Sequence, residues 1–413
     1  MLLRLRRLPA RFVALLRADP SGIRAGFLAL VVSSITGLIA GVVLAHVTGT
    51  LQDLPGLLLL VPAAVGMRGN VFGALSSRLG TAVHMGTFRL SRRLDTDVGQ
   101  NLGAAVLLSL TLSLVLGAAA KGFAVIFAVP HSISLADFIV VSVVGGLIPI
   151  VVVMAITVGV SALSARRGWD LDNVAAPVVT AAADSVTLPS LVLSTGLVSL
   201  PWTTPILAVL CTVLGVGSLI VGLRATKLKV LRRIVQESTP VLIASGCISI
   251  LAGKVEELKL DGIIRNYEIL LVLLPPLLSI SGSLAGIFSA RLSSKLHLGM
   301  LETQKRSVSA ILEDLAFVYA LSIAIFTVLG AATIGVGRMS DLSSPSPALV
   351  FATAVVAGLI ATSLTNIMAY YLAFATYRFS LDPDNFGIPM TAAVSDLLGA
   401  ISFVMTLMVL RLA

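Results

Sequence analysis

Two stretches of this chain repeat one another: WDLDNVAAPVVTAAAD at residues 169–184 and LDPDNFGIPMTAAVSD at residues 381–396. At an offset of 212 they superpose an Asp-x-Asp-Asn element, a proline and a final aspartate. Pro177 therefore aligns with Pro389, and Asp184 aligns with Asp396. Each final aspartate follows a run of apolar, small and hydroxyl residues. The same carboxylate in two such segments indicates an internal duplication.

The composition defines the broad class of protein. Of the 413 residues, 57% are hydrophobic and only 12% are charged, which excludes a soluble globular chain of this length. Apolar runs of about twenty residues can cross a hydrocarbon core of about 30 Å as helices. We therefore expect an all-α polytopic membrane protein with about eleven transmembrane helices. Their expected positions are 23–47, 54–87, 101–129, 135–164, 174–198, 205–223, 240–253, 267–300, 309–337, 346–374 and 386–411.

The distribution of basic residues predicts the orientation in the membrane, because short basic loops stay cytoplasmic. With the N-terminus inside, the cytoplasmic segments hold eighteen Lys and Arg residues and the outer segments hold few. We expect a plasma membrane protein with a cytoplasmic N-terminus and an outside C-terminus, and a basic arm at 1–22 on the inner leaflet of the lipid bilayer. The net charge of +9 then reflects topology, and no nucleic acid partner is expected.

A second pair of segments extends the duplication. GMRGNVFGALSSRLGTAVHMG begins at Gly66 and aligns at an offset of 213 with SISGSLAGIFSARLSSKLHLG, which begins at Ser279. Gly69 falls on Gly282 in this alignment. Duplicated units of this kind are common in transporters.

These alignments predict the domain organisation. A five-helix repeat at 23–200 is followed by a linking helix and basic loop at 201–239, and then by a second five-helix repeat at 240–413. An odd number of helices would invert the second copy, and the linking helix restores its orientation. The two repeats should therefore be parallel and related by a pseudo-twofold axis along the membrane normal, so that a monomer has pseudo-dimeric symmetry.

Asp184 and Asp396 should lie near mid-membrane, because each follows the cytoplasmic end of its helix by about eleven residues at 1.5 Å per residue. They are the only acidic residues expected at that depth. A charged aspartate at the bilayer centre costs about 2.5–3.5 kcal/mol and normally faces a polar cavity. Facing each other across the axis, the two carboxylates repel unless a proton or a cation lies between them.

Oxygen ligands favour a hard cation such as Mg²⁺, Ca²⁺ or Mn²⁺, and Na⁺ also accepts them. Thr180 lies one turn before Asp184 and can add a hydroxyl. Pro177 and Pro389 should each free the carbonyl four residues earlier. An alternative is that a membrane aspartate simply pairs with Arg68.

The GMRGN segment supplies further candidates. Gly69 and Gly282 allow either close helix contacts or a local break that lines a cavity. Asn70 offers an amide oxygen, but its counterpart is Ser283, which would make the site asymmetric. Arg68 is either a structural counter-ion or a residue that gates the pathway and repels anions.

These motifs resemble those of the solute carrier family 41 proteins and of the bacterial MgtE magnesium channels. GMRGNVFGALSSRLGTAVHMG is similar to their second-helix motif, and LDNVAAPVVTAAAD and DPDNFGIPMTAAVSD are similar to their last-helix motif. The resemblance implies a Mg²⁺ pathway along the twofold axis with Asp184 and Asp396 at the ion site. Asn70 matches the family asparagine, whereas Ser283 departs from it. The bacterial N-domain and CBS pair have no counterpart in this sequence, so gating by that route is not expected.

The leading hypothesis is transport of divalent cations, Mg²⁺ above all, as the carried substrate. The alternative is an exchanger coupled to Na⁺ or H⁺ that uses the same carboxylates. An enzyme is not expected, because the sequence offers no Ser/His constellation and no HExxH motif. A membrane scaffold would leave the paired aspartates without a purpose.

Overall fold

The computed structural model describes residues 20–46, 54–86, 88, 91, 93–167, 171–198, 202–297, 308–340, 342–379 and 386–412. Within these ranges the chain forms eleven helices and no strand. The helices are α3 (Pro20–His46), α5 (Leu57–His84), α6 (Asp97–Ile126), α7 (Leu135–Arg167), α8 (Leu171–Thr195), α9 (Thr203–Arg224), α10 (Lys229–Asn266), α11 (Ile269–His297), α12 (Val308–Met339), α13 (Pro347–Arg378) and α14 (Ile388–Val409). All eleven are long and apolar enough to cross a membrane, which agrees with the predicted all-helical class and number of spans.

Helix α6 illustrates how the local sequence determines a helix start. The hydroxyl of Thr96 accepts a hydrogen bond from the amide of Gly99 at 3.1 Å, and Asp97 places a negative charge in the first turn. Both features stabilise the amide-rich end of a helix. The helix therefore begins at this cap, ahead of residue 101, where hydropathy predicted its start.

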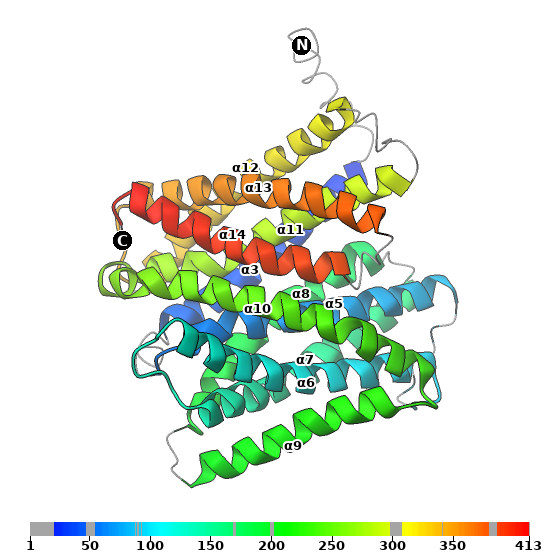
Figure 1. Ribbon diagram of the computed structural model, residues 1–413. Helices are drawn as coiled ribbons and strands as arrows, with labels where there is room; N and C mark the ends of the chain where they lie inside the picture. The colour runs from blue at the N-terminus through cyan, green and yellow to red at the C-terminus, as the bar shows by residue number, and fades with distance from the viewer. Residues whose placement is uncertain are drawn as a thin grey trace.

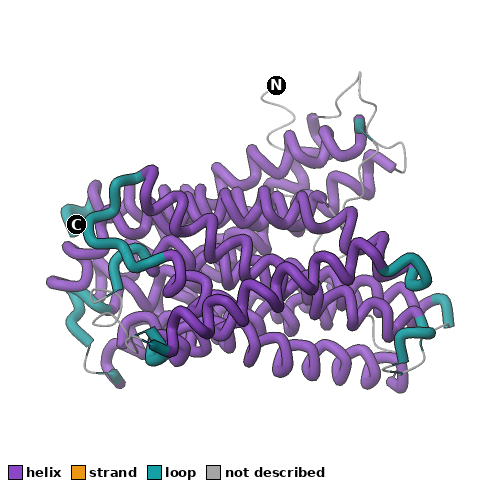
Figure 2. Tube along the Cα trace, turned by 60° about the horizontal axis from the view of Figure 1, so that its bottom comes forward, coloured by secondary structure: helices purple, strands orange, loops and turns teal. Residues whose placement is uncertain are grey.

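The helices lie side by side and form one bundle (Figures 1 and 2). The contacts of the first five helices and of the last five follow a common pattern. Helix α3 packs on α8 and α11, and α10 packs on α14 and α5. In the same way α7 packs on α6 and α8, while α13 packs on α12 and α14. Helices α7 and α13, which precede the two aspartate helices, thus have equivalent neighbours. The same holds for α3 and α10, the first helices of the two halves.

Two glycines bring helices of opposite halves into backbone contact. A Cβ on Gly41 of α3 would collide with the backbone of Val272 in α11. A Cβ on Gly253 of α10 would lie 2.5 Å from the carbonyl oxygen of Leu58 in α5. Small residues permit this approach between membrane helices, where packing is a main source of association. The halves are therefore held together by direct helix contact.

Helix α9 lies at the edge of the bundle (Figure 1) and packs on α6 and α7. Its outer face is apolar, and Val209 and Val213 are each 64% exposed. An apolar face of this size on a spanning helix is suited to lipid. The linking helix therefore separates the halves in sequence without entering the core.

Two elements differ from the expected boundaries or shape. Helix α5 is continuous through Gly69, so the glycines there allow close helix contacts rather than a break. Helix α10 starts at Lys229 and ends at Asn266, well beyond the expected span of 240–253 on both sides. Its ends carry charged residues, which hydropathy excludes from a span although they remain helical.

Candidate cation site

Asp184 lies near the middle of α8 and is only partly buried. Its Oδ2 accepts a hydrogen bond from the hydroxyl of Ser279 in α11 at 3.2 Å. The Ser279 hydroxyl is in turn 2.7 Å from the hydroxyl of Ser33 in α3. Two helices, α3 of the first half and α11 of the second, thus supply the chain of hydroxyls that ends at this carboxylate.

Asp396 lies in the corresponding part of α14 and is also partly buried. The hydroxyl of Ser249 in α10 lies 3.5 Å from its Oδ2. Gly66 of α5 faces the same oxygen, since a Cβ there would lie 3.4 Å away. Gly66 aligns with Ser279 at the offset of 213, so each aspartate faces the same position on the second helix of the other half.

Asp184 and Asp396 are close enough for their charges to repel one another. The structure describes no ion pair from a basic side chain to either carboxylate within the ranges it covers. Two ionised carboxylates in a medium of low dielectric are unfavourable unless a positive charge compensates them. This arrangement is suited to a cation or a proton, and it brings together the two residues that the sequence singled out.

Thr180 lies against the glycine face of α5. Its methyl group would be 3.4 Å from a Cβ on Gly69, and its hydroxyl would be 4.0 Å from a Cβ on Gly73. Gly69 therefore serves the close packing of α5 on α8. In the second half, a Cβ on Gly282 would lie 3.8 Å from the Cβ of Ser395, so α11 also approaches α14 at this level.

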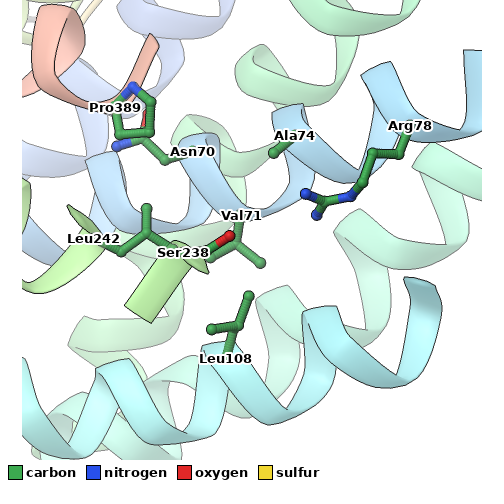
Figure 3. Close-up of a pocket in the computed structure, with 8 residues that line it drawn as sticks. All are labelled: Asn70, Val71, Ala74, Arg78, Leu108, Ser238, Leu242 and Pro389. Carbon is green, nitrogen blue, oxygen red and sulfur yellow. The ribbon is translucent and has the colours of Figure 1, made fainter. Parts of the chain in front are cut away.

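Asn70 and Ser283 occupy aligned positions but have different surroundings. Asn70 is buried and lines a small pocket with Arg78, Ser238 and Pro389 (Figure 3). The Ser283 hydroxyl donates to the carbonyl of Ser279 within its own helix at 2.9 Å. The structure shows no hydrogen bond from either residue to an aspartate in the part of the chain that it describes.

The two prolines of the repeated segments are not equivalent. Pro389 stands in the first turn of α14, where a missing amide costs no helix hydrogen bond. The carbonyl that it was expected to free belongs to residue 385, which lies outside the described residues. Pro177 lies within α8, and its side chain also lies outside the described set.

Arg68 is completely buried, and its guanidinium lies against α6 and α7. It donates to the carbonyl of Ala64 at 3.1 Å and to the hydroxyl of Ser113 at 2.9 Å. Gly146 of α7 leaves room for the guanidinium, since a Cβ there would collide with it. Among the described residues it makes no ion pair, so the alternative in which Arg68 neutralises a membrane aspartate gains no support.

Sequence reasoning missed one buried acid near this pair. Glu256 of α10 is 6% exposed and is close enough to Asp396 to repel its charge. Hydropathy ended the span at Lys254 and so left Glu256 outside it. The sequence did contain a signal for its position. Glu256 lies seven residues after Ser249, and this spacing places both residues on the same face of a helix.

Comparisons with known proteins agree with the transporter hypothesis. A family model described as MgtE, divalent cation transporter, matches residues 61–194 and again residues 274–406. The chain is similar to solute carrier family 41 member 2 of Xenopus laevis, with 26% identity over 398 residues covering 85% of this chain and 66% of that relative. The protein of that name from Homo sapiens is 25% identical over 368 residues, covering 83% of this chain and 62% of its own length. The chain thus spans less than two thirds of the length of these relatives, and no solved structure matches it significantly.

The two matched segments make up more than half of the chain and include the helices α5–α8 and α11–α14. The family model therefore applies once to each half, as the aligned motifs predicted. Its members are transporters, which confirms that the chain is not an enzyme. By this double match, the chain belongs to the MgtE family of divalent cation transporters.

Proposed function

We propose that this protein transports divalent cations, with Mg²⁺ as the main substrate, through a pathway between its two halves. The observation that carries the proposal is the placement of Asp184 and Asp396, each facing the second helix of the other half and neither in an ion pair among the described residues. Each is held by serine hydroxyls alone among the described residues. A divalent cation between them removes the repulsion and supplies the missing positive charge.

The packing of the helices supports a pathway on a pseudo-twofold axis. The first helix and the fourth helix of each half have equivalent neighbours. We infer that α9, as a single linking span, lets the second half keep the orientation of the first. Under this relation Asp184 and Asp396 stand on opposite sides of the axis. One chain then contains both halves of a complete pathway, so the protein works as a monomer. We place it in the plasma membrane with a cytoplasmic N-terminus, as the distribution of basic residues predicts.

The ligand chemistry favours a partly hydrated Mg²⁺. Two carboxylates and the hydroxyls of Ser279, Ser249 and Thr180 are hard oxygen donors. They are too few to replace a full hydration shell, and Mg²⁺ usually keeps several waters. Asn70 lines the pocket that also includes Pro389. We place this pocket beside the cation pathway, where the Asn70 amide oxygen can contact an ion at a second position.

Flux into liposomes that contain a Mg²⁺-sensitive dye tests the proposal. We expect Asp184→Asn and Asp396→Asn each to lower the initial Mg²⁺ flux at least tenfold, because each removes one of the two compensating charges. The matched control is Asp95→Asn, which removes an exposed carboxylate paired with Arg93 in a loop and should leave the flux unchanged. Wild-type flux in both membrane variants would exclude these residues from the pathway.

The same assay separates a channel from an exchanger coupled to Na⁺ or H⁺. We expect Mg²⁺ flux to persist when the Na⁺ and H⁺ gradients across the liposome are removed. Flux that stops without one of these gradients would establish coupled exchange at the same carboxylates.

A further inference from the structure

Glu256 is a buried acid for which the described residues supply no ion pair. Its side chain is 6% exposed, and its Oε1 has neither solvent contact nor a hydrogen-bond partner in the described part of the protein. A buried charge normally has a partner of opposite charge or binds a metal, because its hydration is lost. The environment of Glu256 is therefore incomplete unless a positive species occupies it.

The position of Glu256 on α10 links it to the aspartate pair. It lies two helical turns beyond Ser249, about 10 Å along the axis and on the same face. The hydroxyl of Ser249 is 3.5 Å from Asp396. Helical side chains lean toward the N-terminus of their helix, so the Glu256 carboxylate leans back toward this level. The two carboxylates are close enough to repel.

Two basic side chains near Glu256 that the structure describes, Lys254 and Arg68, have other partners. Lys254 pairs with Glu257 at 2.7 Å, and among the described residues no ion pair joins it to Glu256. Residues two apart on a helix point in different directions, so Lys254 does not share the face of Glu256. Arg68 of the neighbouring α5 donates to a carbonyl and a hydroxyl on its other side.

Packing alone does not require an acid at this position. Gly253 aligns with Gly41 at the offset of 212, and each glycine touches the second helix of the other half. In the same alignment Glu256 falls on Leu44, which is 3% exposed. A leucine fills the equivalent place in the first half, so the second half has a carboxylate where an apolar side chain fits the fold.

We propose that Glu256 forms a second cation site of the pathway, displaced from Asp396 toward the C-terminal end of α10. The basic-residue distribution predicts that end to be extracellular. The site takes a hydrated divalent cation, for which Glu256 supplies a carboxylate ligand and water supplies most of the others. A cation there lies between the outside and the aspartate pair. An ion that moves inward therefore meets Glu256 before Asp396, and an ion that moves outward meets Glu256 after Asp396. This inference rests on the proposed function and adds an asymmetric step to it.

Binding of Mn²⁺ to the purified full chain tests the inference, with bound and free Mn²⁺ distinguished by electron paramagnetic resonance. We expect Glu256→Gln to lose one bound Mn²⁺ per protein or to weaken one Kd at least tenfold, while a site at the aspartates remains. The control Glu257→Gln removes the neighbouring carboxylate that pairs with Lys254 and should keep both sites. Unchanged number and affinity in Glu256→Gln overturn the inference alone. A wild-type protein that binds no Mn²⁺ overturns the proposed function itself.

Two further variants keep the test valid if Glu256→Gln folds poorly. Glu256→Leu copies Leu44 of the first half and should fold, yet it should lose the same site. Glu256→Asp keeps the charge and should retain that site with a weaker Kd. Loss of the site in Glu256→Asp together with its retention in Glu256→Leu would also overturn the inference.

Discussion

The two carboxylates at the centre of this protein occupy aligned positions but have different surroundings. Asp184 accepts a hydrogen bond from Ser279 of the opposite half. Asp396 meets Gly66 at that position and receives its hydroxyl from Ser249 of its own half. A duplicated scaffold therefore fixes where the charges lie, while single side chains decide how each charge is stabilised.

A second difference lies near the start of the third helix of each half. Asp314 of α12 is buried and pairs with Arg291 at 2.9 Å and with Lys295 at 2.6 Å. The aligned residue in the first half is Asn101, whose Oδ1 has no partner in the described part of the chain. Arg291 of α11 thereby joins its helix to α12. At this level the second half has a buried carboxylate with two basic partners where the first half has an amide.

The largest effect is expected from the packing that the halves have in common. Gly253→Leu should abolish correctly folded protein, because its Cβ alone would lie 2.5 Å from the Leu58 carbonyl oxygen and 2.8 Å from the Leu59 Cα. Gly217→Leu on α9 is the matched control, since nothing lies within 4 Å of its Cβ position. Size-exclusion profiles in detergent would measure the outcome. A monodisperse Gly253→Leu protein would show that the halves do not need this contact.

The charged cluster gives an intermediate effect. Asp314→Asn makes the second half resemble the first and leaves two partly exposed cations without their acid. Loss of one partner from a fully buried ion pair costs about 3–5 kcal/mol, and the exposure of Arg291 and Lys295 reduces this to about 2 kcal/mol. We expect a melting temperature lower by a few degrees in detergent. Glu237→Gln, which breaks an exposed pair with Arg233, should change it little, and equal changes in both variants would contradict a special role for the cluster.

The smallest effect, and the most specific, comes from exchanging the hydroxyl between the halves. Ser279→Gly removes the hydrogen bond to the Asp184 carboxylate. A hydrogen bond to a charged group contributes about 1.5 kcal/mol at the low end of the usual range, so the apparent Mg²⁺ affinity should weaken about tenfold. Gly66→Ser should strengthen it, because the new side chain fits 3.4 Å from Asp396 and brings a hydroxyl. The concentration dependence of liposome flux measures both changes.

Ser281→Gly provides the control for the loss of a helical serine, because its hydroxyl donates to the Leu277 carbonyl of its own helix. It should leave the apparent affinity unchanged. If Ser281→Gly and Ser279→Gly weakened the affinity equally, the effect would come from helix stability and not from the hydrogen bond to Asp184.

The sequence predicted several features of the molecule correctly. Hydropathy identified all eleven helices, because a chain in lipid must satisfy its backbone within continuous helices. The aligned motifs also singled out Asp184 and Asp396, and the structure brings these two together. The same alignments predicted that the family model would apply to both halves. These features depend on local composition and on identity between segments, both of which are visible without coordinates.

Other features depend on packing between helices that are distant in sequence. Glu256 lies in a part of α10 that hydropathy rejects, and its burial depends on contacts with helices distant in sequence. The direction of Arg68 also depends on packing, since Gly146 of α7 provides the space that its guanidinium fills. Asn70 faces a pocket formed with α10 and α14 and not the aspartate pair.

The sequence by itself determined the membrane class, the helix count and the two repeated aspartates, because apolar length and repeated motifs are local properties. Only the tertiary structure decided which hydroxyl meets each carboxylate and that Glu256 is buried. Those relations depend on how helices from opposite halves approach one another. Glycine contacts such as that of Gly253 with α5 set this approach, and they become visible only when the helices are packed.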